Sequence, residues 1–413
     1  MDELRVLSIY EGFFSGGARI LHSDVVMGLH EGGQRHSVLS LNGEMYREAT
    51  RQRMEDDVCF RSLTGAGVPV TSLGRSHGAP GGPDAFTGPE LAVTARAMAG
   101  ADVILSLKEQ PLGLLNQAGL PRRPVVVCLH RSDPENQGPA LDELRTAVAD
   151  GRIAAAICCA ESTRAAYAAA GIPAELLHVI PNGVDLLRFR PDPFGRALLR
   201  TSLGVPADAP VIVFAARYAG MKNVPLFLRA ARAWLRRQPE GRILMCGAGM
   251  TRANAGLRED MLAAFGDETP LTDRISLLGV RDDMEIVYAA ADVVSLTSSS
   301  GEAAPLSLIE GMMCGAVPVA TDVGDCASIV AGHGFLTPLD AEAVAQAWCE
   351  AVERGAEFAQ ALALSRERFS RTRMIAAYAG LVERVRGGSA GRVSLSVPEP
   401  LPEPLPEPLP EPF

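Results

Sequence analysis

The chain has 413 residues, 47% of them hydrophobic, and a formal net charge of −10 at pH 7. This length exceeds what one hydrophobic core usually supports, so two domains are expected. The acidic balance argues against nucleic-acid binding, which requires neutralisation of many phosphates. No stretch reaches the roughly 20 apolar residues of a membrane span, and the first residues enter a strand without a signal segment. We therefore expect a cytoplasmic protein, with peripheral membrane contact through a local basic patch left open.

The eight cysteines are scattered through the chain in apolar settings, and no CxxC pair occurs. This pattern indicates small buried thiols rather than disulfides or a zinc site. Asp282 and Asp283 resemble a metal-binding pair, but a helix N-cap is the preferred interpretation because a helical pattern follows them directly. No metal site is predicted from these residues.

Strand-like runs alternate with helical patterns along the chain, which favours an α/β fold with parallel sheets. The segment 42–98 is rich in Gly, Pro and polar residues and gives no clear pattern. In the rest of the first half, strands are expected at 4–10, 36–41, 102–106, 124–129, 153–158 and 176–180, and helices at 18–31, 140–149 and 161–170.

The second half repeats this alternation after a turn at Asn182-Gly183 and a connector at 186–210. Strands are expected at 211–216, 242–247, 274–278, 292–297 and 316–320, and helices at 223–238, 252–265, 283–290, 304–314, 340–355 and 368–387. The Pro-Glu-Pro-Leu repeats of 398–412 predict an extended tail, since alternating prolines forbid helix and central strand. A docking segment for a partner is the functional alternative for this tail.

Polar residues follow several first-half strands at their carboxyl ends, where ligands collect in open α/β sheets. Gly16 and Gly17 offer backbone amides after the first strand, but the third glycine of a dinucleotide fingerprint is missing, so NAD binding is not supported. His130 follows a later strand, and a structural role for it is weighed equally with a functional one. The other candidates beside the same cleft, on the acceptor side, are Lys108, Glu109, Arg131 and Asp133.

The second half has the ingredients of a phosphate site. Arg217 and Lys222 lie between a strand end and a helix start, which suits a diphosphate in charge and geometry. Only two of the 39 basic Lys and Arg residues are lysines, so ordinary surface basicity is a poorer explanation for Lys222. Gly249 follows the next strand and permits close approach of a ligand, which is a weak signal alone.

The stretch from Ser298 to Val319 reads as a loop, a short helix and a strand. The helix start offers free amides to phosphates, and two carboxylates, Glu302 and Glu310, can accept hydrogen bonds from sugar hydroxyls. The alternative is a solvated surface helix. The sequence contains no GxSxG elbow and no GxxxxGK[ST] loop, so hydrolase and P-loop interpretations lack their key residues.

Together these elements resemble the GT-B-fold retaining glycosyltransferases of family GT4, also called glycosyltransferase group 1, over about residues 1–387. The matching elements, in order, are the Gly-Gly-Ala loop at 16–18, His130, Ile180-Pro181-Asn182-Gly183-Val184-Asp185 with Phe189, Arg217 with Lys222, Leu278-Gly279, the Glu302/Glu310 pair and Gly315-Ala316-Val317-Pro318-Val319.

The resemblance implies two facing Rossmann-like domains with a deep cleft between them. Residues 1–185 would bind the acceptor and 186–367 the nucleotide-sugar donor. A helix at 368–387 would cross back to the first domain, and 388–413 would form a mobile Pro/Glu-rich tail.

The resemblance also implies roles for individual residues. Arg217 and Lys222 would hold the diphosphate and stabilise the leaving group, and Glu310 would bind the ribose. The remaining donor-side roles are Glu302 and His130 at the sugar, Leu306 and Ser307 at the phosphates, the backbone of Val280 and Arg281 at the base, and Gly17 in domain closure.

The implied activity is transfer of a hexosyl sugar from a nucleoside-diphosphate sugar to an acceptor hydroxyl, with retention of configuration. A UDP-sugar is the favoured donor, and neither metal nor cofactor is expected because Arg217 and Lys222 replace the cation. The acceptor is left open among small molecules, lipid-linked molecules and glycans. The two alternatives are a catalytically silent GT-B scaffold and a GT-B nucleotide-sugar epimerase.

The sequence departs from the family pattern at three places. Arg19 stands where Glu often follows Gly-Gly-Ala, and Ala216 replaces the usual glycine before the phosphate arginine. Ala303-Ala304 follows Glu302 where Gly and an aromatic residue are common. These extra methyl groups are predicted to alter donor choice, and no charged group of the donor site is lost.

Overall fold

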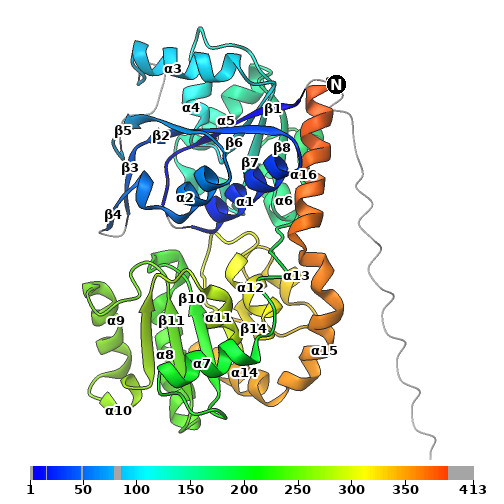
Figure 1. The fold of residues 1–413 in the computed structure, drawn as a ribbon. Coiled ribbons are helices and arrows are strands. Elements are labelled where there is room, and N and C mark those ends of the chain that lie inside the picture. The colour runs from blue at the N-terminus through cyan, green and yellow to red at the C-terminus, as the bar shows by residue number, and fades with distance from the viewer. Residues whose placement is uncertain (1–2, 15, 48–49, 79–84, 389–413) are drawn as a thin grey trace, which may run out of the picture.

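The computed structural model describes residues 3–14, 16–47, 50–78 and 85–388. The predicted α/β fold is confirmed, with two parallel sheets in separate halves that lie one above the other (Figure 1). The first sheet has the strand order β5-β2-β1-β6-β7-β8-β9. Its strands are β1 (Arg5–Tyr10), β2 (Arg35–Asn42), β5 (Val70–Arg75), β6 (Val103–Leu107), β7 (Val125–Leu129), β8 (Ile153–Cys158) and β9 (Leu177–Val179).

The second sheet has the order β12-β11-β10-β13-β14-β15. Its strands are β10 (Val211–Ala215), β11 (Arg242–Cys246), β12 (Ile275–Gly279), β13 (Val293–Leu296), β14 (Val317–Thr321) and β15 (Phe335–Thr337). In each sheet the order of strands reverses beside the first strand: later strands are added on its other side, starting with β6 next to β1 and β13 next to β10. Such a switch point leaves a crevice at the carboxyl ends of the strands, and the loops that follow these strands line the cavity described below.

The buried strands are nearly continuous runs of Val, Ile, Leu and Ala, because helices cover both faces of each parallel sheet. In the first half these helices are α1 (Gly17–Glu31), α2 (Val58–Gly65), α3 (Gly88–Ala99), α4 (Leu112–Leu115), α5 (Ala140–Ala149) and α6 (Glu161–Ala169). In the second half they are α7 (Pro193–Ser202), α8 (Val224–Arg237), α9 (Ala255–Phe265), α10 (Thr269–Thr272), α11 (Met284–Ala289), α12 (Leu306–Met313), α13 (Cys326–Val330), α14 (Ala341–Glu353) and α15 (Gly355–Ser365).

Two segments differ from the sequence predictions. The unparsed segment 42–98 contains the hairpin β3 (Glu44–Arg47) and β4 (Thr50–Arg53), followed by α2, β5 and α3. The segment predicted as a connector contains α7, which starts at Pro193 after the N-cap Asp192. The Asp192 carboxylate accepts hydrogen bonds from the amides of Phe194 and Gly195, so the helix start carries an ordinary N-cap and N1 proline signal.

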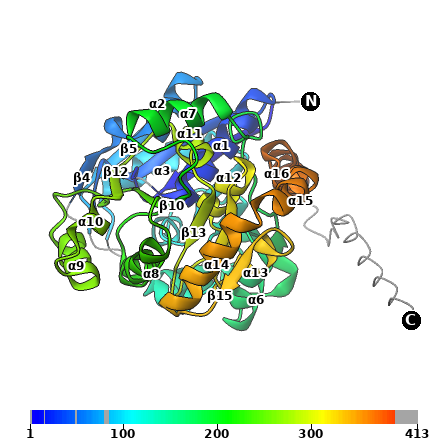
Figure 2. The same cartoon turned by 90° about the horizontal axis from the view of Figure 1, so that it is seen from below.

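The last described helix, α16 (Arg371–Arg386), returns to the first half and packs beside α1 (Figure 1). Met374 and Tyr378 share a buried cluster with Leu21 and Val25 of α1. Seen from below, α15 and α16 lie together along one side of the molecule (Figure 2). The crossing point is tight, because a Cβ on Gly183 would lie 2.5 Å from the carbonyl oxygen of Ser370. The C-terminal segment is therefore part of the core of the first half.

All eight cysteines are free thiols, and all but the half-buried Cys349 are buried, which confirms that prediction. The predicted proline-rich tail lies outside the described residues. Within the described ranges, no helix combines the length and apolar character that crossing a membrane would need.

Candidate active site

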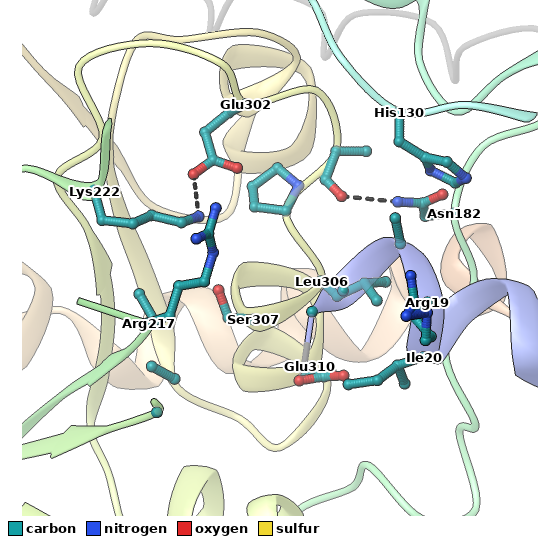
Figure 3. A pocket seen from close by; sticks show the side chains of 18 of the residues that line it. Arg19, Ile20, His130, Asn182, Arg217, Lys222, Glu302, Leu306, Ser307 and Glu310 are labelled. Carbon is teal, nitrogen blue, oxygen red and sulfur yellow. Dashed lines mark hydrogen bonds and ion pairs between the residues drawn. The ribbon is translucent and has the colours of Figure 1, made fainter. Parts of the chain in front are cut away.

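A cavity of about 330 Å³ lies between the two halves of the chain. Loops after β1 and after β6 to β9 line it from the first half, and loops after β10 to β13 line it from the second, together with the start of α12. We call these the N-terminal wall and the C-terminal wall. Figure 3 shows Arg217, Lys222 and Glu302 on one side of the cavity and His130, Asn182 and Arg19 on the other.

Lys222 and Glu302 form an ion pair on the C-terminal wall (Figure 3). Lys222 lies in the turn before α8, where Asn223 adopts a left-handed backbone and caps the helix by accepting from the amide of Leu226. The hydroxyl of Ser298 donates a second hydrogen bond to the Glu302 carboxylate at 2.6 Å. Both charged side chains are largely buried, so each fixes the other in place. The predicted contact of Glu302 with a donor sugar stays a prediction.

Arg217 follows β10 and lines the same wall. Gly247, after β11, allows this approach because it has a φ of +127° and a Cβ there would lie 2.2 Å from the carbonyl oxygen of Ala216. In the run Gly247-Ala248-Gly249, the sequence favours Gly249 for this role. Gly249 does not line the cavity. A Cβ on Gly249 would point towards Tyr218 and Asn254. The glycine at the cavity is therefore the first of the Gly-Ala-Gly run.

The start of α12 faces the cavity with Leu306 and Ser307. The N-cap Pro305 provides no side-chain acceptor and the first turn contains no acidic residue, so the amide groups and positive dipole end of the helix are available to an anion. One turn further, the Glu310 carboxylate accepts from the hydroxyl of Tyr288 at 3.1 Å. Burial raises the pKa of Glu310 to about 7.

The outer edge of the C-terminal wall is formed by Val280 and Arg281. Val280 is an exposed apolar side chain, which suits the flat face of a base. The Arg281 guanidinium donates to the Asp283 carboxylate at 2.7 Å. Asp283 therefore occupies the N-cap position of α11 without capping it, contrary to the predicted side-chain cap. Among the described residues, no group of three His, Cys, Asp or Glu side chains could hold a metal ion.

His130 lies on the N-terminal wall after β7. Burial, and secondarily the charge of Lys108, lowers the pKa of its imidazole to about 3, so the ring is neutral at physiological pH. Its Nε2 atom is buried and has no hydrogen-bond partner among the described residues. A neutral imidazole with an unused nitrogen at the cavity is suited to a sugar hydroxyl.

The other candidates on the N-terminal wall divide into two groups. Gly16, Gly17, Lys108 and Arg131 line the cavity, whereas Glu109 and Asp133 do not. Glu109 is buried and accepts a hydrogen bond from the Tyr167 hydroxyl, so its predicted position beside the cleft is wrong. Asp133 accepts from Arg131 at 2.7 Å.

The two walls touch at several points. A Cβ on Gly17 would lie 3.5 Å from Leu306, and one on Gly301 would lie 3.0 Å from the Arg131 guanidinium. Ala303 packs in a buried cluster with Cys159 and Ala160 of the first half. The methyl group of Ala303, predicted to affect donor choice, therefore also contributes to the contact between the halves.

Two residues of the N-terminal wall were not predicted as site residues from the sequence. The Asn182 side chain donates to the carbonyl oxygen of Ala304 at 2.8 Å and thereby joins the walls (Figure 3). Arg19 lines the cavity although it was noted only as a departure from a family pattern. The Asn-Gly turn could have indicated Asn182. A basic residue in the first turn of a helix could have indicated Arg19.

Comparisons with known proteins agree with this arrangement. A model described as glycosyl transferase 4-like domain matches residues 16–183, and one described as glycosyl transferases group 1 matches 209–354. The D-inositol 3-phosphate glycosyltransferase of Kineococcus radiotolerans is 35% identical over 166 residues, which are 39% of this chain and 38% of that protein. The Xylanimonas cellulosilytica protein of the same name is 32% identical over 205 residues, 48% and 46% of the two chains. The aligned region thus spans less than half the length of these relatives.

The fold is also similar to that of solved structures. HepE of Anabaena, in a complex with UDP and glucose, superposes with a TM-score of 0.75 at 24% identity, covering 92% of this chain and 100% of that one. WaaG, a glycosyltransferase involved in lipopolysaccharide biosynthesis, superposes with a TM-score of 0.61 at 15% identity over 92% of this chain and 99% of its own. These likenesses show the fold.

Proposed function

The chain belongs to the group 1 glycosyltransferases of family GT4 with the GT-B fold, and from this premise we propose that it transfers a hexosyl group from a nucleoside-diphosphate sugar to an acceptor hydroxyl. The observation that carries the proposal is the C-terminal wall. Arg217, Lys222 and the uncapped start of α12 surround one end of the cavity, and the Glu310 carboxylate lies one turn further along the helix. Cations and amides there match a diphosphate, and a carboxylate matches the ribose hydroxyls.

In the proposed reaction, the bond between the anomeric carbon and the β-phosphate oxygen breaks while the acceptor oxygen bonds to the same carbon. Negative charge grows on the leaving diphosphate, where Arg217, Lys222 and the α12 amides stabilise it. The proton of the acceptor hydroxyl passes to the leaving phosphate. We propose that these fixed cations replace a metal ion and that no cofactor takes part.

Retention of configuration is proposed to follow from attack on the same face as the leaving group. Two observations favour this route over a covalent intermediate. Glu109 and Asp133 on the N-terminal wall are hydrogen-bonded to Tyr167 and Arg131, and neither lines the cavity. The neutral His130 is placed to hold a sugar hydroxyl rather than to act as a nucleophile.

A UDP-sugar is the proposed donor, because HepE, a neighbour in fold, is described in complexes with UDP-glucose and with UDP and glucose. The acceptor is proposed to be a small molecule, a lipid-linked molecule or a glycan. The name of the Kineococcus relative makes D-inositol 3-phosphate a rational first acceptor to test. A cytoplasmic location remains part of the proposal.

The test is an NMR time course of the purified chain with UDP-, GDP- or dTDP-glucose, in EDTA, with and without D-inositol 3-phosphate. The proposal expects release of the nucleoside diphosphate, with the new or hydrolysed glucosyl group first appearing as the α-anomer. Inversion at the sugar C2 without an acceptor would instead identify an epimerase. Binding of the nucleotide sugars without any turnover, also for other acceptors, would identify a silent scaffold.

A further inference from the structure

Arg19 is the most deeply buried charged side chain of the N-terminal wall that faces the cavity. It is the third residue of α1, its side chain lines the cavity, and the residue is only 3% exposed. Figure 3 shows it on the side of His130 and Asn182, away from Arg217 and Lys222. The Arg19 side chain thus lies across the cavity from the two cations of the proposed diphosphate site (Figure 3).

The guanidinium has no hydrogen-bonding partner among the residues that the structure describes. Nε and Nη1 are buried without an acceptor, and no described carboxylate forms an ion pair with the group. Burial lowers the pKa of Arg19, and the smaller electrostatic effects of Tyr10 and Asp57 act in the opposite direction. A buried cation without an acceptor is costly, so such an arrangement is unusual unless a ligand completes it.

Three aromatic rings hold the guanidinium in place. Its central carbon lies 4.1 Å from the ring centre of Phe14, 5.5 Å from that of Tyr10 and 5.7 Å from that of Phe13. Cation–π contacts of this kind orient the group but supply no hydrogen-bond acceptor for its N–H donors. The rings therefore explain the position of Arg19 and leave its donors unused.

The start of α1 adds to the positive charge at this point. The N-cap Gly16 has no side-chain acceptor, and the first turn contains no acidic residue. A basic side chain in the first turn is the opposite of what the helix dipole favours, so the sequence here concentrates positive potential rather than balancing it. An anion bound between the helix start and Arg19 would satisfy both.

We propose that Arg19 and the first turn of α1 form a second anion site in the cavity, which binds a carboxylate or phosphate carried by the acceptor or by the transferred sugar. This inference rests on the proposed function for the identity of the substrates. It assigns to the N-terminal wall a specificity for charged over neutral substrates.

Arg19→Met tests the proposal, because Met keeps much of the apolar volume inside the aromatic cage and removes the charge and all donors. Arg19→Lys is the matched variant that retains the charge. Calorimetric titrations measure UDP alone, then inorganic phosphate with UDP saturating. Two pairs of probes identify the source of the anion: D-inositol 3-phosphate against myo-inositol, and UDP-glucuronate against UDP-glucose.

The proposal expects the wild-type chain to bind phosphate and to prefer the charged member of at least one pair by tenfold or more. Arg19→Met should abolish phosphate binding and that preference, with UDP affinity within twofold of wild type and an unfolding midpoint that is equal or higher. Arg19→Lys should retain part of the preference. If the preference for D-inositol 3-phosphate is lost, the anion belongs to the acceptor. If the preference for UDP-glucuronate is lost, the anion belongs to the transferred sugar.

Three results would overturn the proposal. One is a wild-type chain that binds none of the charged probes better than the neutral ones. Another is a preference that Arg19→Met leaves intact. The third is a tenfold loss of UDP affinity in Arg19→Met, which would assign Arg19 to the diphosphate. A wild-type chain that binds no UDP would contradict the proposed function, and titration of the free protein with phosphate would still test the anion site.

Discussion

The two walls of the cavity differ in how their buried charged and polar groups are satisfied. On the C-terminal wall, Glu302 holds Lys222 and accepts from Ser298, and Glu310 accepts from Tyr288. On the N-terminal wall, Arg19 and His130 retain buried nitrogen atoms without a partner among the described residues. The buried side chains of the C-terminal wall thus hold one another in place, whereas the N-terminal wall has buried side-chain nitrogen atoms that a ligand could satisfy.

This difference fits a division of labour. Preorganised charges at the site where a leaving diphosphate develops charge give the largest catalytic effect, since they need no rearrangement during the reaction. Unsatisfied donors discriminate strongly between substrates, because a substrate that lacks the matching acceptor leaves a buried polar group unpaired. The C-terminal wall is therefore expected to govern rate and nucleotide binding, and the N-terminal wall to govern substrate choice.

The largest expected effect comes from Lys222→Ala. Removing this cation should lower kcat by about 10²–10³-fold, the typical cost of losing one preorganised group at a developing negative charge. The measurement is steady-state release of UDP in EDTA. A loss below threefold would contradict the assigned role.

A control is needed because Lys222→Ala leaves the Glu302 carboxylate buried without its cation, which destabilises the fold. The double variant Lys222→Ala with Glu302→Gln removes this unpaired charge. It should recover the thermal unfolding midpoint without recovering kcat. Recovery of both would show that the single variant loses activity through instability.

A smaller effect is expected from the ionisation of Glu310. Burial raises the pKa of Glu310 from its ordinary value of 4.5 to about 7, so ionised Glu310 lowers the stability of the fold above pH 7. This cost disappears as the pH falls towards 4.5. Ribose hydroxyls need the ionised form as acceptor. UDP affinity should therefore fall about tenfold from pH 8 to pH 6, beyond the change caused by UDP itself.

Glu310→Gln is the control for this pH dependence, because it cannot ionise. Calorimetric titration should show that the about tenfold fall in UDP affinity between pH 8 and pH 6, expected for the wild-type chain, is absent from this variant. The variant should also be more stable than wild type at pH 8 and similar near pH 4.5. Equal pH dependence in both chains would exclude Glu310 from nucleotide binding.

The smallest effect is expected at a contact outside the cavity that joins the two halves of the chain. The Asp325 carboxylate accepts from the amides of Glu161 and Ser162 at 3.2 and 3.0 Å and thus caps α6, whose own N-cap Ala160 cannot do so. Losing a cap costs about 1 kcal/mol, equivalent to about fivefold. Asp325→Ala should lower the rate of transfer up to about fivefold and leave UDP affinity within about twofold.

The nearby exposed Asp322 provides the matched control for that variant. Asp322→Ala should leave both the rate of transfer and UDP affinity unchanged. If Asp325→Ala lowers UDP affinity as much as it lowers the rate of transfer, nucleotide binding requires both walls. That result would contradict the assignment of nucleotide binding to the C-terminal wall.

The C-terminal wall could largely be predicted from the sequence because its groups lie beside local signals. Arg217 and Lys222 follow a strand and precede a helix start, and Glu310 lies one turn inside another helix. Gly249 was chosen over Gly247 because local sequence does not show which glycine of a Gly-Ala-Gly run meets the Ala216 carbonyl.

The N-terminal wall was harder to predict because tertiary contacts decide which side chains face the cavity. Glu109 follows Lys108 directly, yet one is turned to Tyr167 and the other to the cavity. The cage of Arg19 combines Tyr10 at the end of β1 with Phe13 and Phe14 in the following loop, and no periodic pattern reveals it.

The most direct test of the division between the walls is a calorimetric titration of UDP, in EDTA, into the wild-type chain, Lys222→Ala and Arg19→Met. Losing a charge-assisted hydrogen bond should weaken binding by about 10–100-fold in Lys222→Ala. Arg19→Met should bind UDP as the wild-type chain does. Equal losses in the two variants, or a loss only in Arg19→Met, would contradict the assignment of the nucleotide to the C-terminal wall.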